Sequence, residues 1–225
     1  MKKLLLVVVV SLITLTGCGN KDFEKEVLSF FYLNTNLEVT IYHTNEDDFN
    51  FEEMNQDIDK IFSDLENKFS RTKKGSMLYN VNSKKNIEVD DEFLMVLNRS
   101  IEVCKETKGK FDPTAGELIE LWSINNKDYL PTQAEINKAL KSVDCNNVKV
   151  VGNKVYTDGI LDFGSVVKGY SGDKVEEYLR SKGVKSALLN LGGNIQLIGK
   201  KPITIKGLNK DSIQGDAKII DVIKQ

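Results

Sequence analysis

The residues best suited to chemistry lie in one stretch, residues 161–173, with the sequence LDFGSVVKGYSGD. Its order predicts the apolar end of a strand, a turn at Gly164 and a helix that begins near Lys168. Backbone N–H groups at a helix N-terminus carry partial positive charge, and a lysine adds a full one. The stretch therefore predicts a site for phosphate groups. The alternative is an ordinary strand-to-helix turn in which the glycines only permit tight geometry.

The N-terminal residues indicate export. Lys2 and Lys3 precede a short apolar run at residues 4–13, which is typical of a signal peptide and too short to span a bilayer. The LTGC that follows resembles a bacterial lipobox, in which the cysteine becomes lipid-modified and then forms the mature N-terminus. We therefore expect removal of residues 1–17 and a lipid anchor on Cys18. The alternative is a plain secretory signal followed by an incidental cysteine.

The remaining cysteines and the net charge argue against a disulfide-rich domain, a zinc site and a nucleic-acid-binding protein. Cys104 and Cys145 are too few for a disulfide framework and lack the clustering of a zinc site. They could form one bridge in an oxidising compartment, but we favour two small buried apolar side chains. Loss of Lys2 and Lys3 with the signal changes the formal net charge from -2 to -4. The sequence shows no basic stripe, so we expect no nucleic-acid partner.

Apolar spacing predicts several helices in the first half of the chain. The apolar residues of 54–69 and 93–104 recur at helical spacing. A third helix is expected to begin at Asp112 and Pro113, with the aspartate as N-cap and the proline in the first helical position. A fourth is expected after Thr132, which has a glutamate three positions later, as in a capping box.

Strands are expected at the beginning and in the second half. Residues 37–41 alternate between apolar and polar types, and residues 187–191 form an apolar run. Two further strands, residues 148–151 and 154–157, flank a Gly-Asn pair that is typical of a tight hairpin. Helices cluster early and strands cluster late, which predicts an α+β architecture and not a regular doubly wound sheet.

Four motifs in a fixed order carry a family resemblance. They are FYLNT at 31–35, GKFDPTAGELIELW at 109–122, LDFGSVVKGYSGD at 161–173 and LNLGGNIQLIGKKP at 189–202. Together they resemble the ApbE-type FAD:protein FMN transferases. The resemblance implies an α+β, ApbE-like (T-fold-related) mixed sheet with packed helices over residues 30–202. Residues 18–29 would then be a tether, and residues 203–225 a divergent tail.

Members of that family split FAD at its pyrophosphate and move the FMN part onto a Thr or Ser hydroxyl of a target protein, with release of AMP. The resemblance implies FAD as substrate, Mg²⁺ as cofactor and an acceptor protein, which we expect to be a subunit of a membrane electron-transfer complex. It also implies a lipid-anchored enzyme on the outer side of a bacterial cell membrane. A divalent ion, a lysine and helix N-terminal amides can stabilise the charge that moves to the leaving AMP.

The resemblance assigns cofactor contacts to six residues, which are Leu33, Lys110, Phe111, Asp112, Asp162 and Lys168. It assigns the backbone carbonyl of Ser165 to Mg²⁺ and identifies no catalytic residue. Asp112 is expected to act both as helix cap and as cofactor contact, because capping uses one oxygen. Thr72 stands where some members carry a tyrosine near the cofactor, so aromatic stacking at that position is lost or supplied elsewhere. Trp122 is expected to close a hydrophobic core near a helix end, and the alternative is a rim position beside the adenine.

The resemblance is expected to stop after Pro202. Family members continue with a His-x-x-Asp-Pro-like segment and an Asp-Ala-x-x-Thr-Ala-like segment, whose Asp and Thr complete the magnesium shell, and neither occurs here. Mg²⁺ prefers six oxygen ligands that include one or two carboxylates, so we expect weak metal binding. Two alternatives to the transferase stay open: a non-catalytic flavin-binding lipoprotein, and a truncated remnant that lacks the metal carboxylate.

Overall fold

Five segments of the chain are described by the computed structural model, namely residues 24–83, 87–122, 129–199, 203–205 and 218–220. Side chains are described up to residue 199. The expected signal peptide at 1–17 and the expected lipid site at Cys18 lie outside the described residues, as does most of the expected tail at 203–225. Within the described segments, no helix combines the length and the apolar character needed to cross a membrane.

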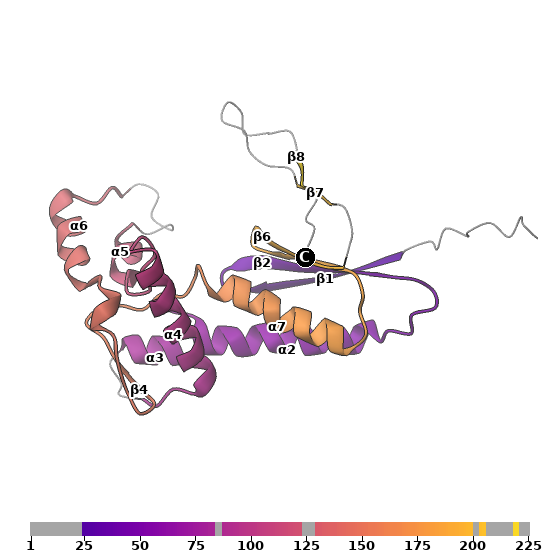
Figure 1. Cartoon of the computed structure of the whole chain (residues 1–225), viewed down its shortest axis with the longest axis horizontal. Coiled ribbons are helices and arrows are strands. Elements are labelled where there is room, and N and C mark those ends of the chain that lie inside the picture. The colour runs from indigo at the N-terminus through magenta and orange to yellow at the C-terminus, as the bar shows by residue number, and fades with distance from the viewer. Residues whose placement is uncertain (1–23, 84–86, 123–128, 200–202, 206–217, 221–225) are drawn as a thin grey trace, which may run out of the picture.

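A four-stranded antiparallel sheet has the strand order β1-β2-β5-β6 (Figure 1). Its strands are β1 (Glu24–Tyr32), β2 (Thr35–His43), β5 (Ala187–Leu191) and β6 (Asn194–Ile198). Alternate residues of β2 and β5 are buried because one face of the sheet carries the core. Leu37 lies opposite Leu191, and Val39 lies opposite Leu189. The alternation predicted at residues 37–41 is therefore confirmed.

The first strand corrects an expected boundary. β1 begins at Glu24, inside residues 18–29, which we expected to be a tether. The strand pairs with β2 residue by residue, starting with Glu24 opposite His43. Leu28 in this strand is buried in the core. The tether prediction is therefore wrong from Glu24 onward, because the strand extends beyond its buried residues Leu28 and Phe30 as a charged end that still pairs with β2.

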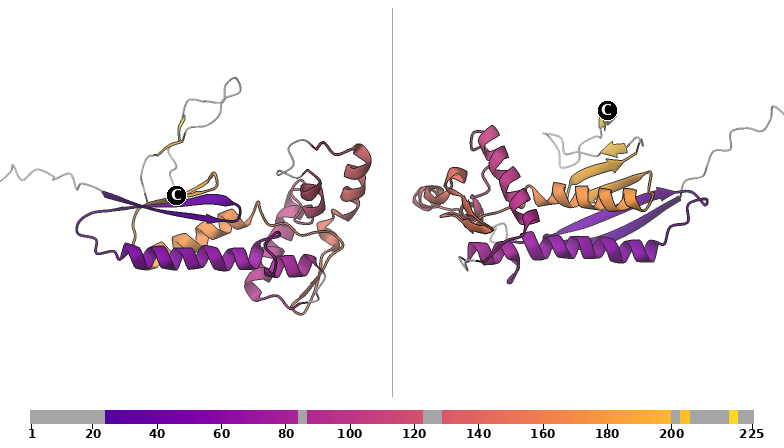
Figure 2. Two further views of the ribbon diagram at one scale, coloured as in Figure 1. Left: turned by 180° about the vertical axis from the view of Figure 1, so that it is seen from behind. Right: turned by 60° about the horizontal axis from the view of Figure 1, so that its bottom comes forward.

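Two long helices cover one face of this sheet (Figures 1 and 2). They are α2 (Phe51–Phe69) and α7 (Val167–Ser181), and they pack against each other. Each is amphipathic, so its apolar stripe faces the sheet. The side chains of Ile58, Phe62, Val175 and Leu179 are fully buried there. We call the sheet with these two helices the sheet lobe.

The remaining helices gather beyond one end of the sheet lobe, at the left of Figure 1. This helical lobe consists of α3 (Met77–Asn82), α4 (Asp91–Glu106), α5 (Gly116–Leu121), α6 (Gln133–Ala139), the 3₁₀ turns η1 (Leu140–Ser142) and η2 (Cys145–Asn147), and the hairpin strands β3 (Lys149–Val151) and β4 (Lys154–Tyr156). Two further short strands, β7 (Ile203–Ile205) and β8 (Lys218–Ile220), pair antiparallel.

Three buried aromatic rings hold the two lobes together. Phe69 ends α2, Phe93 lies in α4, and Phe163 lies in the loop before α7. The ring centroids of Phe69 and Phe93 lie 5.8 Å apart, and those of Phe93 and Phe163 lie 5.6 Å apart. Aromatic pairs in such geometry stabilise the fold beyond the contribution of their buried area alone. The end of α2 and the loop before α7 therefore have fixed positions relative to α4.

Most of the predicted elements are confirmed. The helices predicted at 54–69 and 93–104 lie within α2 and α4, and the hairpin predicted around Gly152 is β3-β4. The side chain of Thr132 and the carboxylate of Glu135 form the expected capping box of α6. These four elements follow from local patterns of spacing and capping, and the α+β fold class is confirmed with them.

Two predicted elements differ from the structure. The apolar residues 161–163 do not form a strand, and the described pairing near them is one isolated parallel bridge between Ala115 and Ile160. The third helix begins at Gly116 and not at Pro113. The reason is that the carboxylate of Asp112 accepts a hydrogen bond from the Thr114 N–H at 2.8 Å. This Asx turn satisfies the backbone two residues on and delays the helix.

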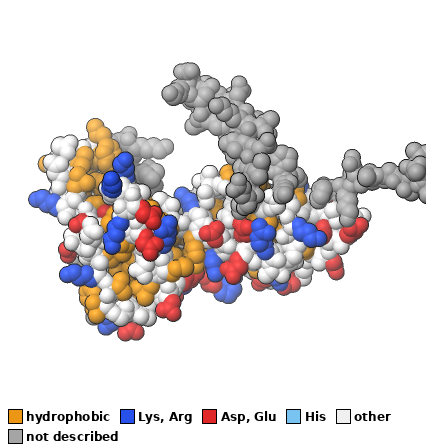
Figure 3. All heavy atoms as spheres, in the orientation of Figure 1, with side chains coloured by type: hydrophobic (Ala, Val, Ile, Leu, Met, Phe, Trp, Pro, Cys, Tyr) orange, Lys and Arg blue, Asp and Glu red, His pale blue; other side chains and the backbone are white. Residues whose placement is uncertain are grey.

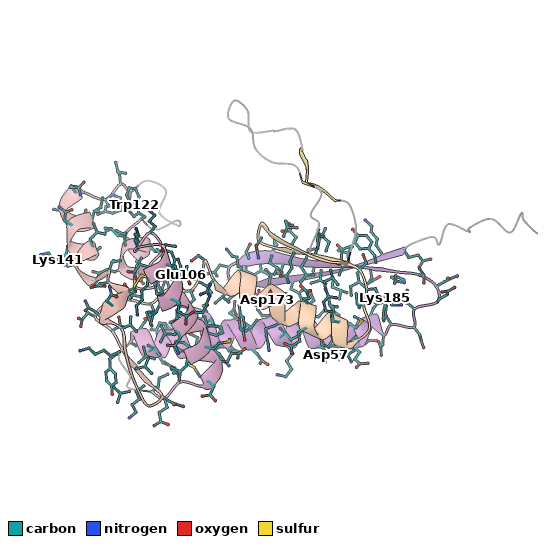
Figure 4. All side chains as sticks on the ribbon, viewed as in Figure 1. Asp57, Glu106, Trp122, Lys141, Asp173 and Lys185 are labelled. Carbon is teal, nitrogen blue, oxygen red and sulfur yellow. A yellow bond between two sulfur atoms is a disulfide. The ribbon has the colours of Figure 1, made fainter. Side chains whose placement is uncertain are left out.

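The expectation for Trp122 is wrong. Its side chain is 49% exposed at the C-terminal end of α5, and Figure 4 places it at the outer part of the helical lobe. Leu130 and Leu140 are also exposed in the neighbouring segments. Figure 3 shows hydrophobic side chains gathered over this part of the molecule. Helical spacing placed the ring near a helix end, but it did not reveal whether another element covers it.

An ion network links α2, α4 and α7. Lys68 forms ion pairs with Asp90, at 2.6 Å, and with Glu92. Glu92 also accepts a hydrogen bond from the hydroxyl of Tyr170 at 2.6 Å. Burial opposes the charge on both carboxylates, but the hydrogen bonds from Lys68 outweigh it and hold the pKa of Asp90 and of Glu92 below their ordinary values.

This network predicts a pH-dependent stability. Because the pKa of Glu92 is lower in the folded chain than in the unfolded one, its ionised form stabilises the fold above its ordinary pKa of 4.5, and this contribution disappears as the pH falls through the folded pKa. We expect Glu92→Gln to lower the free energy of unfolding at neutral pH by about 1 to 2 kcal/mol and to flatten its loss at acidic pH. Urea unfolding at neutral pH and near pH 4 measures both effects.

The matched control is Glu102→Gln. Glu102 forms an ion pair with Arg99 on the exposed side of α4. Exposed pairs of this kind contribute little, so we expect a change below about 0.5 kcal/mol. Equal effects of the two substitutions would contradict the assigned role of the network.

Candidate functional site

A cavity lies where the sheet lobe meets the helical lobe. Its walls come from the β1–β2 turn, the end of α2 with the loop that follows, and the loop that leads into α7. The residues that line it are Leu33, Asn34, Phe69, Ser70, Arg71, Thr72, Asp162, Phe163, Gly164, Val167 and Lys168. Together with the open space at its mouth, it contains about 530 Å³ of empty space.

Leu33 reaches the cavity from a strained turn. Leu33 and Asn34 form the two-residue connection of the β1-β2 hairpin, with φ angles of +53° and +58°. Such angles suit the twist of a tight hairpin but are uncommon for a leucine. The carboxylate of Glu66 near the end of α2 accepts a hydrogen bond from the Leu33 N–H at 2.9 Å. The turn is therefore fixed to α2, beside the apolar wall of Phe69, Phe163 and Val167.

The polar wall is organised around Asp162. One carboxylate oxygen accepts a hydrogen bond from the Arg71 Nε at 2.8 Å, and the other accepts from the Gly164 N–H at 2.8 Å. Arg71 also forms an ion pair with Glu120 on α5. The side chains of Arg71 and Asp162 are both mostly buried, at 16% and 17% exposure. Charge-assisted hydrogen bonds in such a setting hold the carboxylate in one orientation.

Lys168 provides the second cation of the cavity. It is the second residue of α7, and no side chain caps the start of that helix. Among the described residues that line the cavity, two are cationic, Arg71 and Lys168, and one is anionic, Asp162. The helix N-terminus adds partial positive charge on the same side. The cavity therefore suits an anionic group, as residues 161–173 predicted.

The segment of Lys110, Phe111 and Asp112 does not line this cavity. Lys110 is exposed and Phe111 is half-buried. Asp112 faces the opposite side of the segment, where one oxygen accepts hydrogen bonds from the N–H and the hydroxyl of Thr114, and the other accepts from the Cys145 N–H at 3.0 Å. Both oxygens are used within the protein, so Asp112 supports the loop that it belongs to.

Cys104 and Cys145 form a disulfide beside Asp112. We favoured two separate buried thiols, and that expectation is wrong. Both residues are buried, as predicted, but burial brings the end of α4 and the turn η2 close enough for a bond. The open alternative of one bridge is the one that the structure contains. The disulfide joins the two elements that flank residues 109–112, and the hydrogen bond from the Cys145 N–H connects Asp112 to one of them.

The described residues do not form a magnesium site at the cavity. Ser165, whose carbonyl the resemblance assigned to Mg²⁺, lies exposed in the turn before α7. Asp162 is the carboxylate of the described lining, and both its oxygens already accept hydrogen bonds. Within the described segments, the one group of possible metal ligands joins Asp112 to Cys104 and Cys145. Those sulfurs are bonded to each other, which leaves no thiolate for a metal.

The structure brings together three of the six expected cofactor residues, Leu33, Asp162 and Lys168, and it adds Arg71. Arg71 was not among the expected site residues, although the adjacent Thr72 was expected near the cofactor position and also lines the cavity. The Arg71 side chain meets an aspartate 91 positions away. No local sequence pattern predicts a contact between residues so far apart. The only available signal was the position of Arg71 beside Thr72.

The comparisons with known proteins identify the family of this chain. The model of the ApbE family matches residues 33–224. The chain belongs to the ApbE family. The resemblance carried by the four motifs is thereby confirmed. The match also continues beyond Pro202, where we expected the resemblance to stop.

Curated relatives carry the name FAD:protein FMN transferase. The protein from Vibrio cholerae is 27% identical over 217 residues, which cover 92% of this chain and 62% of that protein. The protein from Haemophilus influenzae is 29% identical over 190 residues, which cover 76% of this chain and 55% of that protein. The chain therefore spans less than two thirds of the length of these relatives.

Solved structures share the fold. The flavin transferase ApbE from Vibrio cholerae superimposes with a TM-score of 0.78 at 23% identity, over 89% of this chain and 69% of that one. The ApbE protein from Thermotoga maritima gives a TM-score of 0.77 at 24% identity, over 88% of this chain and 68% of that one. The expected ApbE-like fold is confirmed.

The disulfide is expected to stabilise the helical lobe. Reduction should lower the free energy of unfolding by about 2 to 4 kcal/mol, because a bridge across 41 positions restricts the unfolded chain. Urea unfolding with and without a reductant measures the difference. The reductant should have no such effect on the double variant Cys104→Ala, Cys145→Ala. Recovery of the two cysteines in separate peptides after digestion without reductant would contradict the pairing.

Proposed function

We propose that this protein is an FAD:protein FMN transferase, which moves FMN from FAD to a Thr or Ser hydroxyl of a target protein and releases AMP. The observation that carries the proposal is the cationic cavity with Leu33, Asp162 and Lys168 in it. Family membership and the names of the relatives support the same activity. The cavity combines an apolar wall with a cationic one, which suits a ring system that carries phosphate, and the names of the relatives point to FAD as that ligand.

Different side chains of the cavity would bind different parts of FAD. Leu33, Phe69 and Val167 offer apolar surface to a flat ring. Lys168 and the N-terminal amides of α7 neutralise phosphate oxygens, and they favour the charge that grows on the leaving AMP. Arg71 compensates Asp162, so that this carboxylate does not repel the diphosphate. The chain thus positions the pyrophosphate for attack by an acceptor hydroxyl.

Mg²⁺ belongs to this proposal because the family resemblance implies it. When bound, the ion would neutralise pyrophosphate charge. The described residues alone do not hold it, so the steps above rest on the side chains and backbone amides of this chain. The earlier expectation of weak metal binding stays a prediction.

We also propose an outward-facing, lipid-anchored location on a bacterial cell membrane, with Cys18 as the anchor and an acceptor in a membrane electron-transfer complex. The proposal rests on the lipobox resemblance at residues 15–18. Metabolic labelling with palmitate tests it. Label that persists after Cys18→Ser would exclude Cys18 as the only lipid site.

The transfer itself is tested with FAD, Mg²⁺ and an acceptor that carries a flavinylation motif. We expect acceptor mass to increase by one covalently bound FMN, with AMP released in equal amount. Absence of both products at saturating FAD would reject the transferase. FAD binding that is independent of Mg²⁺, without AMP, would identify the non-catalytic flavin-binding lipoprotein.

Lys168→Ala is expected to raise the Kd for FAD about tenfold or more, because one charge-assisted contact to phosphate is lost. Fluorescence titration with FAD measures it. The control is Lys174→Ala on the same helix, whose side chain forms an ion pair with Glu177 at 3.4 Å and does not line the cavity. If the unsubstituted chain and Lys168→Ala bind FAD with equal Kd, Lys168 does not contact the phosphates.

Arg71→Met is expected to weaken FAD binding about tenfold, because Asp162 would keep an unpaired charge beside the diphosphate. Arg71→Lys retains the cation, so it should raise the Kd for FAD by less than about threefold. The same titration compares them, with the exposed Arg99→Met as control. Equal losses for the two Arg71 variants would show that the shape of the guanidinium, and not its charge, matters.

A further inference from the structure

The segment that presents Asp162 is extended but belongs to no sheet. On one side it runs beside residues 113–116. The Asp162 N–H donates to the Pro113 carbonyl at 2.8 Å, and the Gly116 N–H donates to the Ile160 carbonyl at 2.8 Å. A Cβ atom at Gly116 would lie 2.5 Å from that carbonyl oxygen, so the close approach requires glycine. One edge of the segment is thus held by backbone.

The other edge is held by a single side chain, Asn82. Its Oδ1 accepts a hydrogen bond from the Leu161 N–H at 2.9 Å, and its Nδ2 donates to the Leu161 carbonyl at 2.9 Å. A carboxamide offers a donor and an acceptor side by side, so it can replace a neighbouring strand. Leu161 is completely buried. Loss of either bond would leave a buried backbone group without its partner.

We propose that Asn82 is a positioning residue for FAD binding that acts through Asp162. The inference rests on the proposed function, because it concerns how the cavity holds FAD. Asn82 does not line the cavity. It ends α3 and fixes the backbone one residue before Asp162, whose carboxylate then meets Arg71. The paired amide bonds therefore set the direction in which the carboxylate enters the cavity.

The test compares Asn82→Asp with Asn80→Asp in the full chain, purified in mild detergent. The first variant keeps an acceptor for the Leu161 N–H but sets a carboxylate against the Leu161 carbonyl. The second makes the same chemical change on the same helix, at a residue whose amide donates to the Gly75 carbonyl at 3.2 Å. We expect the Kd for FAD to rise about tenfold for Asn82→Asp and less than about twofold for Asn80→Asp.

A double-mutant cycle separates positioning from general damage. If Asn82 acts through Asp162, Asn82→Asp should change the Kd less than about twofold when Asp162→Asn is already present. An equal change in both backgrounds would overturn the proposal. If Asn82→Asp does not fold, Asn82→Gln replaces it, since it keeps the amide and displaces it by one methylene.

Amide hydrogen exchange without FAD gives an independent result. We expect faster exchange in peptides that cover residues 158–166 of the Asn82 variant, with α2 unchanged. Unchanged exchange in those peptides would overturn the role of Asn82. If the unsubstituted chain does not bind FAD, the proposed function fails, and the exchange experiment still decides whether Asn82 holds this segment.

Discussion

The site depends on the compensation of one mostly buried charge. Asp162 places a carboxylate in a cavity whose other features favour anions, and an unpaired carboxylate there would repel a diphosphate. Arg71 binds it at 2.8 Å, which leaves Lys168 and the start of α7 to act on the ligand. Because Arg71 also pairs with Glu120 on α5, the same guanidinium connects the cavity to the helical lobe.

The cavity is built from connections, and the regular elements serve to hold those connections still. The turn at Leu33 is fixed by Glu66 on α2, and the loop at Phe163 is fixed by ring contacts to Phe69 and Phe93. Neither turn nor loop could keep a strained or extended backbone without such support. Binding residues on loops and rigid helices beneath them are a common division of roles.

Local patterns in the sequence were sufficient for α2, α4, α6, the β3-β4 hairpin and the placement of Lys168 at a helix start. They failed where partners are distant in sequence. Residues 161–163 were expected to be a strand because they are apolar, yet a side chain 79 positions away supplies one edge of their hydrogen bonding. Arg71 meets Asp162 across 91 positions, and the two cysteines meet across 41. Periodicity and capping rules carry no information about such pairs.

The motif at residues 109–122 is part of the family resemblance, but the contacts of its residues in the structure differ from those that the resemblance implies. Lys110, Phe111 and Asp112 were expected at the cofactor, but they lie outside the cavity lining. The segment still reaches the site, because the Pro113 carbonyl holds the Asp162 N–H and the Glu120 carboxylate pairs with Arg71. The segment therefore positions Asp162 through a backbone hydrogen bond and an ion pair. Asp112 in turn accepts a hydrogen bond from the N–H of Cys145, which the disulfide joins to α4.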